Sequence, residues 1–128
     1  MTIKDFKPGQ IVYNLKTITG KTTEHFIRRY KVISTGRKYV RAALDGSDIY
    51  PTEFYLSDGD NEYLTENKDW GNRELLFLTE NDVNDYIEKT MLRGWLRNEI
   101  SERKIRALSL EQLRAIKKIL EGSGNEEK

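Results

Sequence analysis

The chain has 128 residues, of which 37% are hydrophobic and 34% charged, and its formal net charge is +1. This length fits one domain, and two Trp, seven Tyr and four Phe supply core residues that disordered chains lack. Because the chain has no Cys and a single His, His25, disulfides, Cys-ligated zinc, thiol nucleophiles and metal sites with two imidazoles are excluded.

The first half of the chain alternates apolar and polar residues with a period of two, which predicts short β-strands. The pattern indicates five or six strands, at residues 10–16, 24–34, 37–44, 48–56, 62–65 and 74–78. Thr35-Gly36 and Asp45-Gly46 predict tight turns. Pro51 indicates an edge or a bulge in the fourth strand.

From residue 79 the apolar period changes to 3.6, which predicts helices. Thr79 is an N-cap candidate for a helix that runs to about residue 102, and Ser109 with Gln112 forms a capping box for a second helix. Gly122 is a C-terminal stop. The first helix would carry one apolar stripe, made of Val83, Ile87, Met91, Leu92, Trp95, Leu96 and Ile100.

Strands followed by helices, without alternation, predict an α+β domain. Short strands linked by tight turns favour a small closed or half-open antiparallel barrel. We expect the barrel at residues 1–78, a two-helix extension packed on it at 79–121, and a disordered tail at 122–128.

Two stretches, 6–13 and 30–40, carry a family resemblance. They contain Gly9-Gln10-Ile11-Val12-Tyr13 and Gly36-Arg37-Lys38-Tyr39-Val40, and they resemble the first strand and the hairpin of the small, functionally uncharacterised "beta barrel domain" proteins of bacteria and their phages. The resemblance implies an SH3-like barrel with C-terminal helices. It implies no activity, since that family has none to carry over.

The net charge hides a segregation along the chain. Residues 1–43 hold ten Lys or Arg against two acids, residues 44–92 hold three against thirteen, and residues 93–128 hold nine against six. The basic block contains two paired strands on which cations lie among tyrosines, a combination typical of proteins that bind single-stranded nucleic acid. The candidate nucleic-acid-binding residues are Arg28, Arg29, Lys31, Arg37, Lys38, Tyr39 and Arg41. In the alternative interpretation, the tyrosines are core residues and the cations keep edge strands soluble.

Three further residues are candidates for contact with a partner: Trp70, Arg93 and Arg97. Trp70 interrupts a polar loop, where it either covers the barrel mouth or is offered to a partner. Arg93 and Arg97 are one helical turn apart and flank Trp95, although a solvated helix face is the ordinary explanation for them.

The acidic segment 58–73 imitates a calcium loop without meeting its requirements. Asp58, Asp60, Glu62, Glu66 and Asp69 follow EF-hand spacing, but Tyr63 occupies the glycine position and Asp69 replaces the bidentate Glu. We therefore interpret the segment as a solvated acidic loop, and His25 beside Glu24 as a surface histidine rather than a general base.

Neither targeting nor cofactor motifs are found. The start of the chain carries no apolar run, no window approaches 18 apolar residues, and no Gly-rich phosphate loop occurs. We expect a cytoplasmic protein with no cofactor, no metal ion, no catalytic residue and no membrane partner.

The sequence therefore favours a non-enzymatic binding module that contacts nucleic acid or a nucleoprotein through the basic hairpin. The alternative is a protein-interaction domain, for example a phage- or mobile-element-encoded regulator or inhibitor of a host protein. The oligomeric state is left open.

Overall fold

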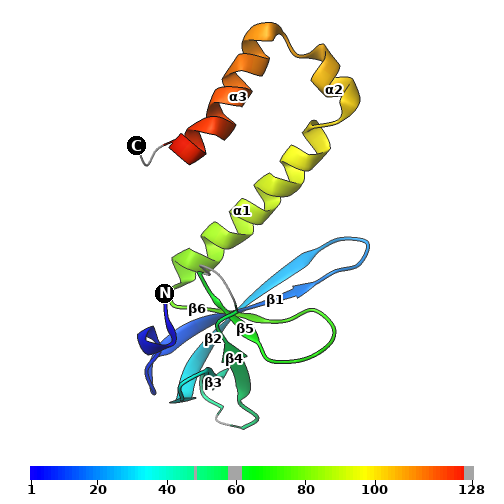
Figure 1. Cartoon of the computed structure of the whole chain (residues 1–128). Helices are drawn as coiled ribbons and strands as arrows, with labels where there is room; N and C mark the ends of the chain where they lie inside the picture. Colours follow the sequence, from blue (N-terminus) through cyan, green and yellow to red (C-terminus); the bar gives the residue numbers. More distant parts are fainter. Residues whose placement is uncertain (48, 58–61, 126–128) are drawn as a thin grey trace. The chain divides into compact units, whose positions relative to one another are not determined.

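A computed structural model describes residues 1–47, 49–57 and 62–125 of the chain. After a short 3-10 turn, η1 (Ile3–Asp5), the described residues form the strands β1 (Ile11–Ile18), β2 (Glu24–Thr35), β3 (Tyr39–Leu44), β4 (Thr52–Tyr55), β5 (Leu64–Glu66) and β6 (Leu75–Phe77). The helices α1 (Glu80–Glu99), α2 (Glu102–Ala107) and α3 (Leu110–Asn125) follow (Figure 1). The chain divides into two compact units, Met1–Lys89 and Thr90–Lys128.

The six strands form a closed antiparallel barrel. Each strand pairs with the next one in sequence, and β1 also pairs with β6, through Tyr13 opposite Phe77 and Leu15 opposite Leu75. The α+β fold with a small barrel, predicted from strand periodicity, is thus confirmed. Closure is the arrangement that removes unpaired edges from short strands.

The β2–β3 connection is a tight turn, and β2 contains a bulge just before it. The register with β3 shifts between Val32 and Ser34, and the amide of Gly36 donates to the carbonyl oxygen of Tyr39 at 2.8 Å. The turn at Gly46, where φ is +90°, closes through a hydrogen bond from Ser47 to Leu44. Both predicted turns are therefore confirmed.

The fourth strand is shorter than predicted. It begins at Thr52 because Tyr50 has a φ of 59° and Pro51 offers no amide for strand pairing. Residue 48, at the predicted start of this strand, lies outside the described residues.

Two buried clusters make up the core of the first unit. The larger fills the barrel, and its buried members are Phe6, Val12, Tyr30, Val32, Val40, Ala42, Phe54, Leu64 and Leu76. The smaller consists of Leu15, Phe77 and Val83, and it joins the barrel to the first turns of α1. Tyr63 and Tyr86 pack around it, with ring centroids 5.3 Å apart.

Helix α1 begins where the sequence predicts. The Thr79 hydroxyl accepts a hydrogen bond from the amide of Asp82 at 3.1 Å, which caps the first turn. Val83 is fully buried and Ile87 packs against the smaller cluster. Of the predicted apolar stripe, the residues from Met91 to Ile100 are exposed instead of forming core.

The second unit is helical and differs from the sequence interpretation in two places. The segment 102–107, expected as a link, is the helix α2, whose N-cap Ser101 accepts from the amide of Lys104 at 3.3 Å. The predicted capping box of Ser109 and Gln112 is confirmed by reciprocal hydrogen bonds of 3.1 and 2.9 Å. Helix α3 continues to Asn125, past the expected stop at Gly122, and residues 126–128 of the predicted tail lie outside the described residues. Among the described helices, none is long and apolar enough to cross a membrane.

Candidate nucleic-acid interface

Three of the predicted nucleic-acid-binding cations form ion pairs with the acidic block of the sequence. Arg28 pairs with Glu74 at 2.9 Å. Arg29 pairs with Asp45 at 3.1 Å, and Arg41 lies 3.4 Å from its cross-strand neighbour Glu53. Folding therefore interleaves part of the segregated charge, and these three cations are partly neutralised within the barrel itself.

Arg28 is the most strongly engaged of the three, because its side chain lies on the same face of β2 as the buried Tyr30. Its Nε and Nη2 atoms donate to Oδ1 of the fully buried Asn14 at 3.2 and 2.9 Å. Asn14 in turn donates to Glu74 Oε1 at 3.0 Å, and the guanidinium lies 5.4 Å from the Tyr30 ring centroid. Arg28 thus belongs to a polar network of the barrel, here called the Asn14–Arg28–Glu74 network.

The same network acts on the Tyr30 hydroxyl. Burial raises the pKa of Tyr30 above its ordinary value of 10.0, and the nearby Glu74 carboxylate, which also accepts a hydrogen bond from it, raises the pKa further. Arg28 opposes this shift. Tyr30 is therefore a neutral hydrogen-bond donor at physiological pH and is unavailable to a ligand.

Three of the other predicted residues, Arg37, Lys38 and Tyr39, lie at the β2–β3 turn around an open pocket of about 450 Å³. Tyr39 lies directly opposite Tyr55 on the neighbouring strand, so the two side chains share one face of the sheet. The residues that line this pocket, here called the tyrosine pocket, are Ile3, Arg37, Lys38, Tyr39, Tyr55 and Leu56. No ion pair joins Arg37 or Lys38 to an acid within the part of the chain that the structure describes.

Lys31 forms a third group. It lies on the opposite face of β2 from Tyr30 and Val32, between Ile11 of β1 and Ala43 of β3, with its side chain exposed. The predicted set is therefore divided into the inward-facing Arg28, the outer-face residues Arg29, Lys31 and Arg41, and the tyrosine pocket. Sequence reasoning missed Tyr55, whose role depends on its register with Tyr39.

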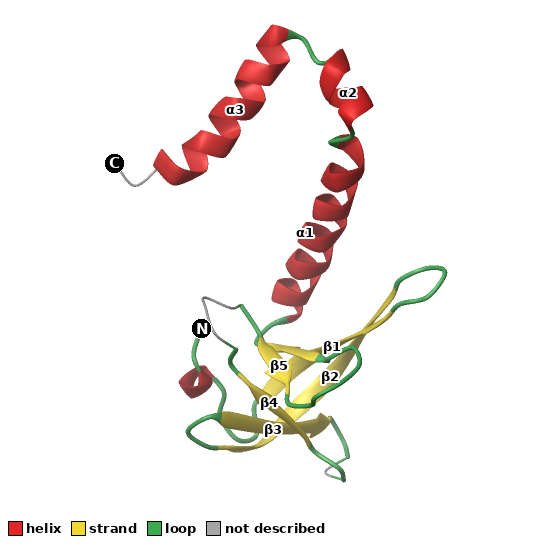
Figure 2. Cartoon of the chain, turned by 45° about the vertical axis from the view of Figure 1, so that its right-hand side comes forward, coloured by secondary structure: helices red, strands yellow, loops and turns green. Residues whose placement is uncertain are grey.

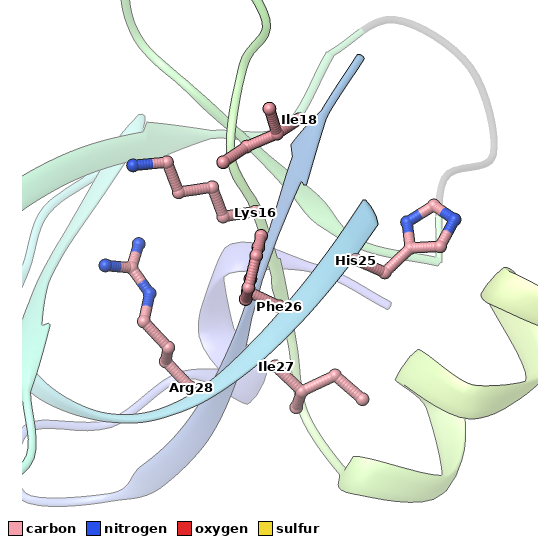
Figure 3. Close-up of a pocket in the computed structure, with 6 residues that line it drawn as sticks. All are labelled: Lys16, Ile18, His25, Phe26, Ile27 and Arg28. Carbon is pink, nitrogen blue, oxygen red and sulfur yellow. The ribbon is translucent and has the colours of Figure 1, made fainter. Parts of the chain in front are cut away.

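A second open pocket, of about 470 Å³, lies on the β1–β2 hairpin where it extends beyond the barrel. Figure 2 shows this extension. Lys16, Phe26 and Arg28 project from one side of the ribbon, and His25 and Ile27 from the other (Figure 3). The alternation of β2 places Phe26 on the same face as the buried Tyr30, yet Phe26 is 42% exposed. His25 is half-buried, with Nδ1 3.1 Å from the Thr17 hydroxyl.

The family of the chain follows from a comparison with family models. The model of the Phage ProQ C-terminal-like domain matches residues 1–127. The chain belongs to this family. The match confirms the resemblance to small phage and bacterial barrel domains. Neither the curated proteins nor the solved structures include a match to the chain.

The predicted partner-binding residues of this ProQ C-terminal-like domain line neither pocket. Trp70, in the β5–β6 loop, is 80% exposed, with the Lys68 ammonium 5.9 Å from its ring centroid. Arg93 and Arg97 are exposed on α1, within the second unit. Asp58 and Asp60 of the acidic segment lie outside the described residues.

Proposed function

We propose that the protein is a non-enzymatic binding module that binds single-stranded nucleic acid at the tyrosine pocket, with RNA as the first candidate. The observation that carries this proposal is the Tyr39–Tyr55 cross-strand pair flanked by Arg37 and Lys38. Membership of a ProQ-like family supports nucleic acid as the ligand. Two expectations from the sequence, a cytoplasmic location and the absence of catalysis, stay predictions.

The chemistry of the tyrosine pocket suits an unpaired nucleotide. Tyrosine rings offer faces on which a base stacks, and Arg37 and Lys38 supply charge for its phosphates. Because these two cations have no acidic partner among the described residues, a phosphate need not displace an existing ion pair. Arg29 and Arg41 are already opposed by Asp45 and Glu53, and they contribute less to affinity.

Fluorescence anisotropy with labelled single- and double-stranded RNA and DNA, at about 50 and 200 mM salt, tests the proposal. We expect single strands to bind better than duplexes, and binding to weaken steeply at the higher salt. Replacing one phosphate-binding cation should lower the slope of log K against log salt by about 0.7 for a single strand.

Arg37→Gln and Arg41→Gln form a matched pair for this experiment, since both remove one arginine charge from the same hairpin. Of these two arginines, Arg41 alone is paired with an acid among the described residues, namely with Glu53. We expect Arg37→Gln to weaken binding more than Arg41→Gln, and Tyr39→Ala to weaken it at both salt concentrations. Absence of binding at the lower salt, or equal losses for the two arginine variants, contradicts the proposed site.

A protein-interaction function is the second candidate, and one observation favours it. In the helical unit Met91, Leu92, Trp95 and Leu96 are 47–66% exposed, an unusual density of apolar side chains for a surface. This candidate predicts that a Leu92→Ser, Leu96→Ser variant loses a protein captured by the wild-type chain and keeps its affinity for oligonucleotides. The nucleic-acid proposal predicts the opposite dependence for Tyr39→Ala.

A further inference from the structure

The β1–β2 hairpin extends beyond the strands that flank it in the barrel. Pairing of β1 with β6 ends at Leu15, and pairing of β2 with β3 begins at Tyr30. Beyond these points Lys16–Ile18 and Glu24–Phe26 pair only with each other, within the described residues. We call residues 16–26 the arm, and we infer that it carries a second contact for the same single-stranded nucleic acid, with Phe26 as the stacking platform. This inference rests on the proposed function.

Phe26 has the surroundings of a base-stacking residue. It lies directly opposite Lys16, and both side chains project from the same side of the ribbon (Figure 3). The pocket around it also includes Ile18, which is 47% exposed. An aromatic face with a lysine beside it accepts a base and its phosphate without regard to sequence.

The charge of the arm favours an anionic ligand. Lys16 and Lys21 are exposed cations, and Glu24 is the one acid between residues 16 and 28 in the sequence. Arg28, at the base of the arm, is already held by Glu74 and Asn14, so its position is fixed by the barrel. A protein partner would need about 800 Å² of surface on this side, whereas the arm offers a few partly exposed apolar side chains.

The arm and the tyrosine pocket lie at opposite ends of β2. Phe26 is near the start of the strand, and Thr35, its last residue, is followed by Arg37 and Lys38. Nine residues at about 3.3 Å each separate the two ends by up to roughly 30 Å. A stacked single strand advances about 3.4 Å per nucleotide, so roughly nine nucleotides span both contacts.

This separation predicts a step in affinity as the oligonucleotide lengthens. A strand too short to reach both sites binds one at a time. A strand that reaches both gains avidity, because the second contact forms at a high effective concentration. Lys31 lies between the two ends along β2, on the opposite face of the strand from Phe26.

The test measures the dissociation constants of labelled oligouridylates of 4, 8, 12 and 16 nucleotides by anisotropy. For the wild-type chain we expect affinity to rise steeply between 4 and 12 nucleotides. Phe26→Ala should weaken binding of the 12-mer roughly 5- to 100-fold, the loss that accompanies removal of one stacking aromatic. The same variant should bind the 4-mer within about twofold of wild type, since the tyrosine pocket is intact.

Three further variants separate stacking from other causes. Phe26→Leu keeps an apolar side chain and a folded arm, and it should still lose the length step. Lys16→Gln should lower the salt dependence for the 12-mer, whereas Lys89→Gln, which changes a lysine already paired with Glu62, should not. Thermal unfolding of each variant shows that the barrel is intact.

The outcomes distinguish this inference from the proposed function. If the wild-type chain binds no oligouridylate, both fail. If it binds, but Phe26→Ala and Lys16→Gln match wild type at every length, the arm is not a contact and the tyrosine pocket alone stands. If Tyr39→Ala has no effect while Phe26→Ala abolishes binding at all lengths, the two-site arrangement is wrong.

Discussion

Replacement of Glu74 by Ala tests whether the Asn14–Arg28–Glu74 network stabilises the barrel. Glu74 Oε1 accepts from Asn14 Nδ2 at 3.0 Å and from Arg28 Nη2 at 2.9 Å. Without it, the fully buried Asn14 amide loses its acceptor, at a cost of about 1–3 kcal/mol. The Arg28 side chain is 34% exposed, so loss of its ion pair adds at most about 1 kcal/mol.

The free energy of unfolding should therefore fall by roughly 1–4 kcal/mol in Glu74→Ala. For a unit of this size, each kcal/mol lowers Tm by about 4–8 °C. Glu74→Gln is the matched control. Because the hydrogen bonds from Asn14 and Arg28 converge on one oxygen, a glutamine side chain can still accept both, and it loses the charge and the second carboxylate oxygen. Its destabilisation should therefore be less than half as large.

Urea unfolding followed by circular dichroism, with a thermal melt at the same pH, measures both variants. A change in the urea midpoint with an unchanged m-value identifies a loss of stability rather than a change in the unfolded state. Equal destabilisation of the two variants, or a loss below about 0.5 kcal/mol in Glu74→Ala, would refute the reasoning from buried hydrogen bonds.

Three other predictions concern the stability of the fold. The pKa of Tyr30 is raised in the folded chain, so the unfolded chain releases this proton at lower pH, and the free energy of unfolding should fall as pH rises through about 10. In melts at a series of pH values, Tyr30→Phe should show a smaller fall. The same dependence of Tm on pH in both chains would contradict this prediction. Leu76→Ala, at a fully buried barrel position, should cost about 2–5 kcal/mol, whereas Met91→Ala, 66% exposed, should stay within about 0.5 kcal/mol; urea midpoints compare the two. Thr79→Ala removes the hydroxyl that accepts from the amide of Asp82, and it should lower the free energy of unfolding by about 1 kcal/mol. Thr79→Ser keeps this hydroxyl and should be nearly as stable as the wild type.

Most of the barrel was predictable because its signals are local. Val40 lies between the exposed Tyr39 and Arg41, as the alternation of a strand requires, and Thr35-Gly36 and Asp45-Gly46 identify the turns. The helix caps at Thr79 and Ser109 were equally predictable from the sequence. The short helix α2 was missed, although Ser101 followed by Glu102 is an N-terminal signal, because the segment is too short to show apolar periodicity.

The candidate site was less predictable because its contacts are long-range. Arg28 and Glu74 are 46 residues apart in the chain, and no local pattern shows that the fold brings them together. The pairing of Tyr39 with Tyr55 requires the register of β3 and β4, which alternation alone does not supply. Phe26 has the correct parity for the core, but parity cannot tell how far a strand extends beyond its neighbours.

The unequal lengths of the strands have a consequence for local opening. The barrel amides lie in a ladder with neighbours on both sides, so their exchange with deuterium requires disruption of the closed sheet. The arm is a two-stranded ribbon, an arrangement that is marginally stable by itself, although Asn72 contacts it at Thr19 with a 3.2 Å hydrogen bond. Its amides should therefore exchange through small, frequent openings that leave the barrel folded. A ligand that orders the arm spends part of its binding free energy on suppressing those openings. Its binding should therefore slow the hydrogen exchange of the amides at Lys16–Ile18 and Glu24–Phe26.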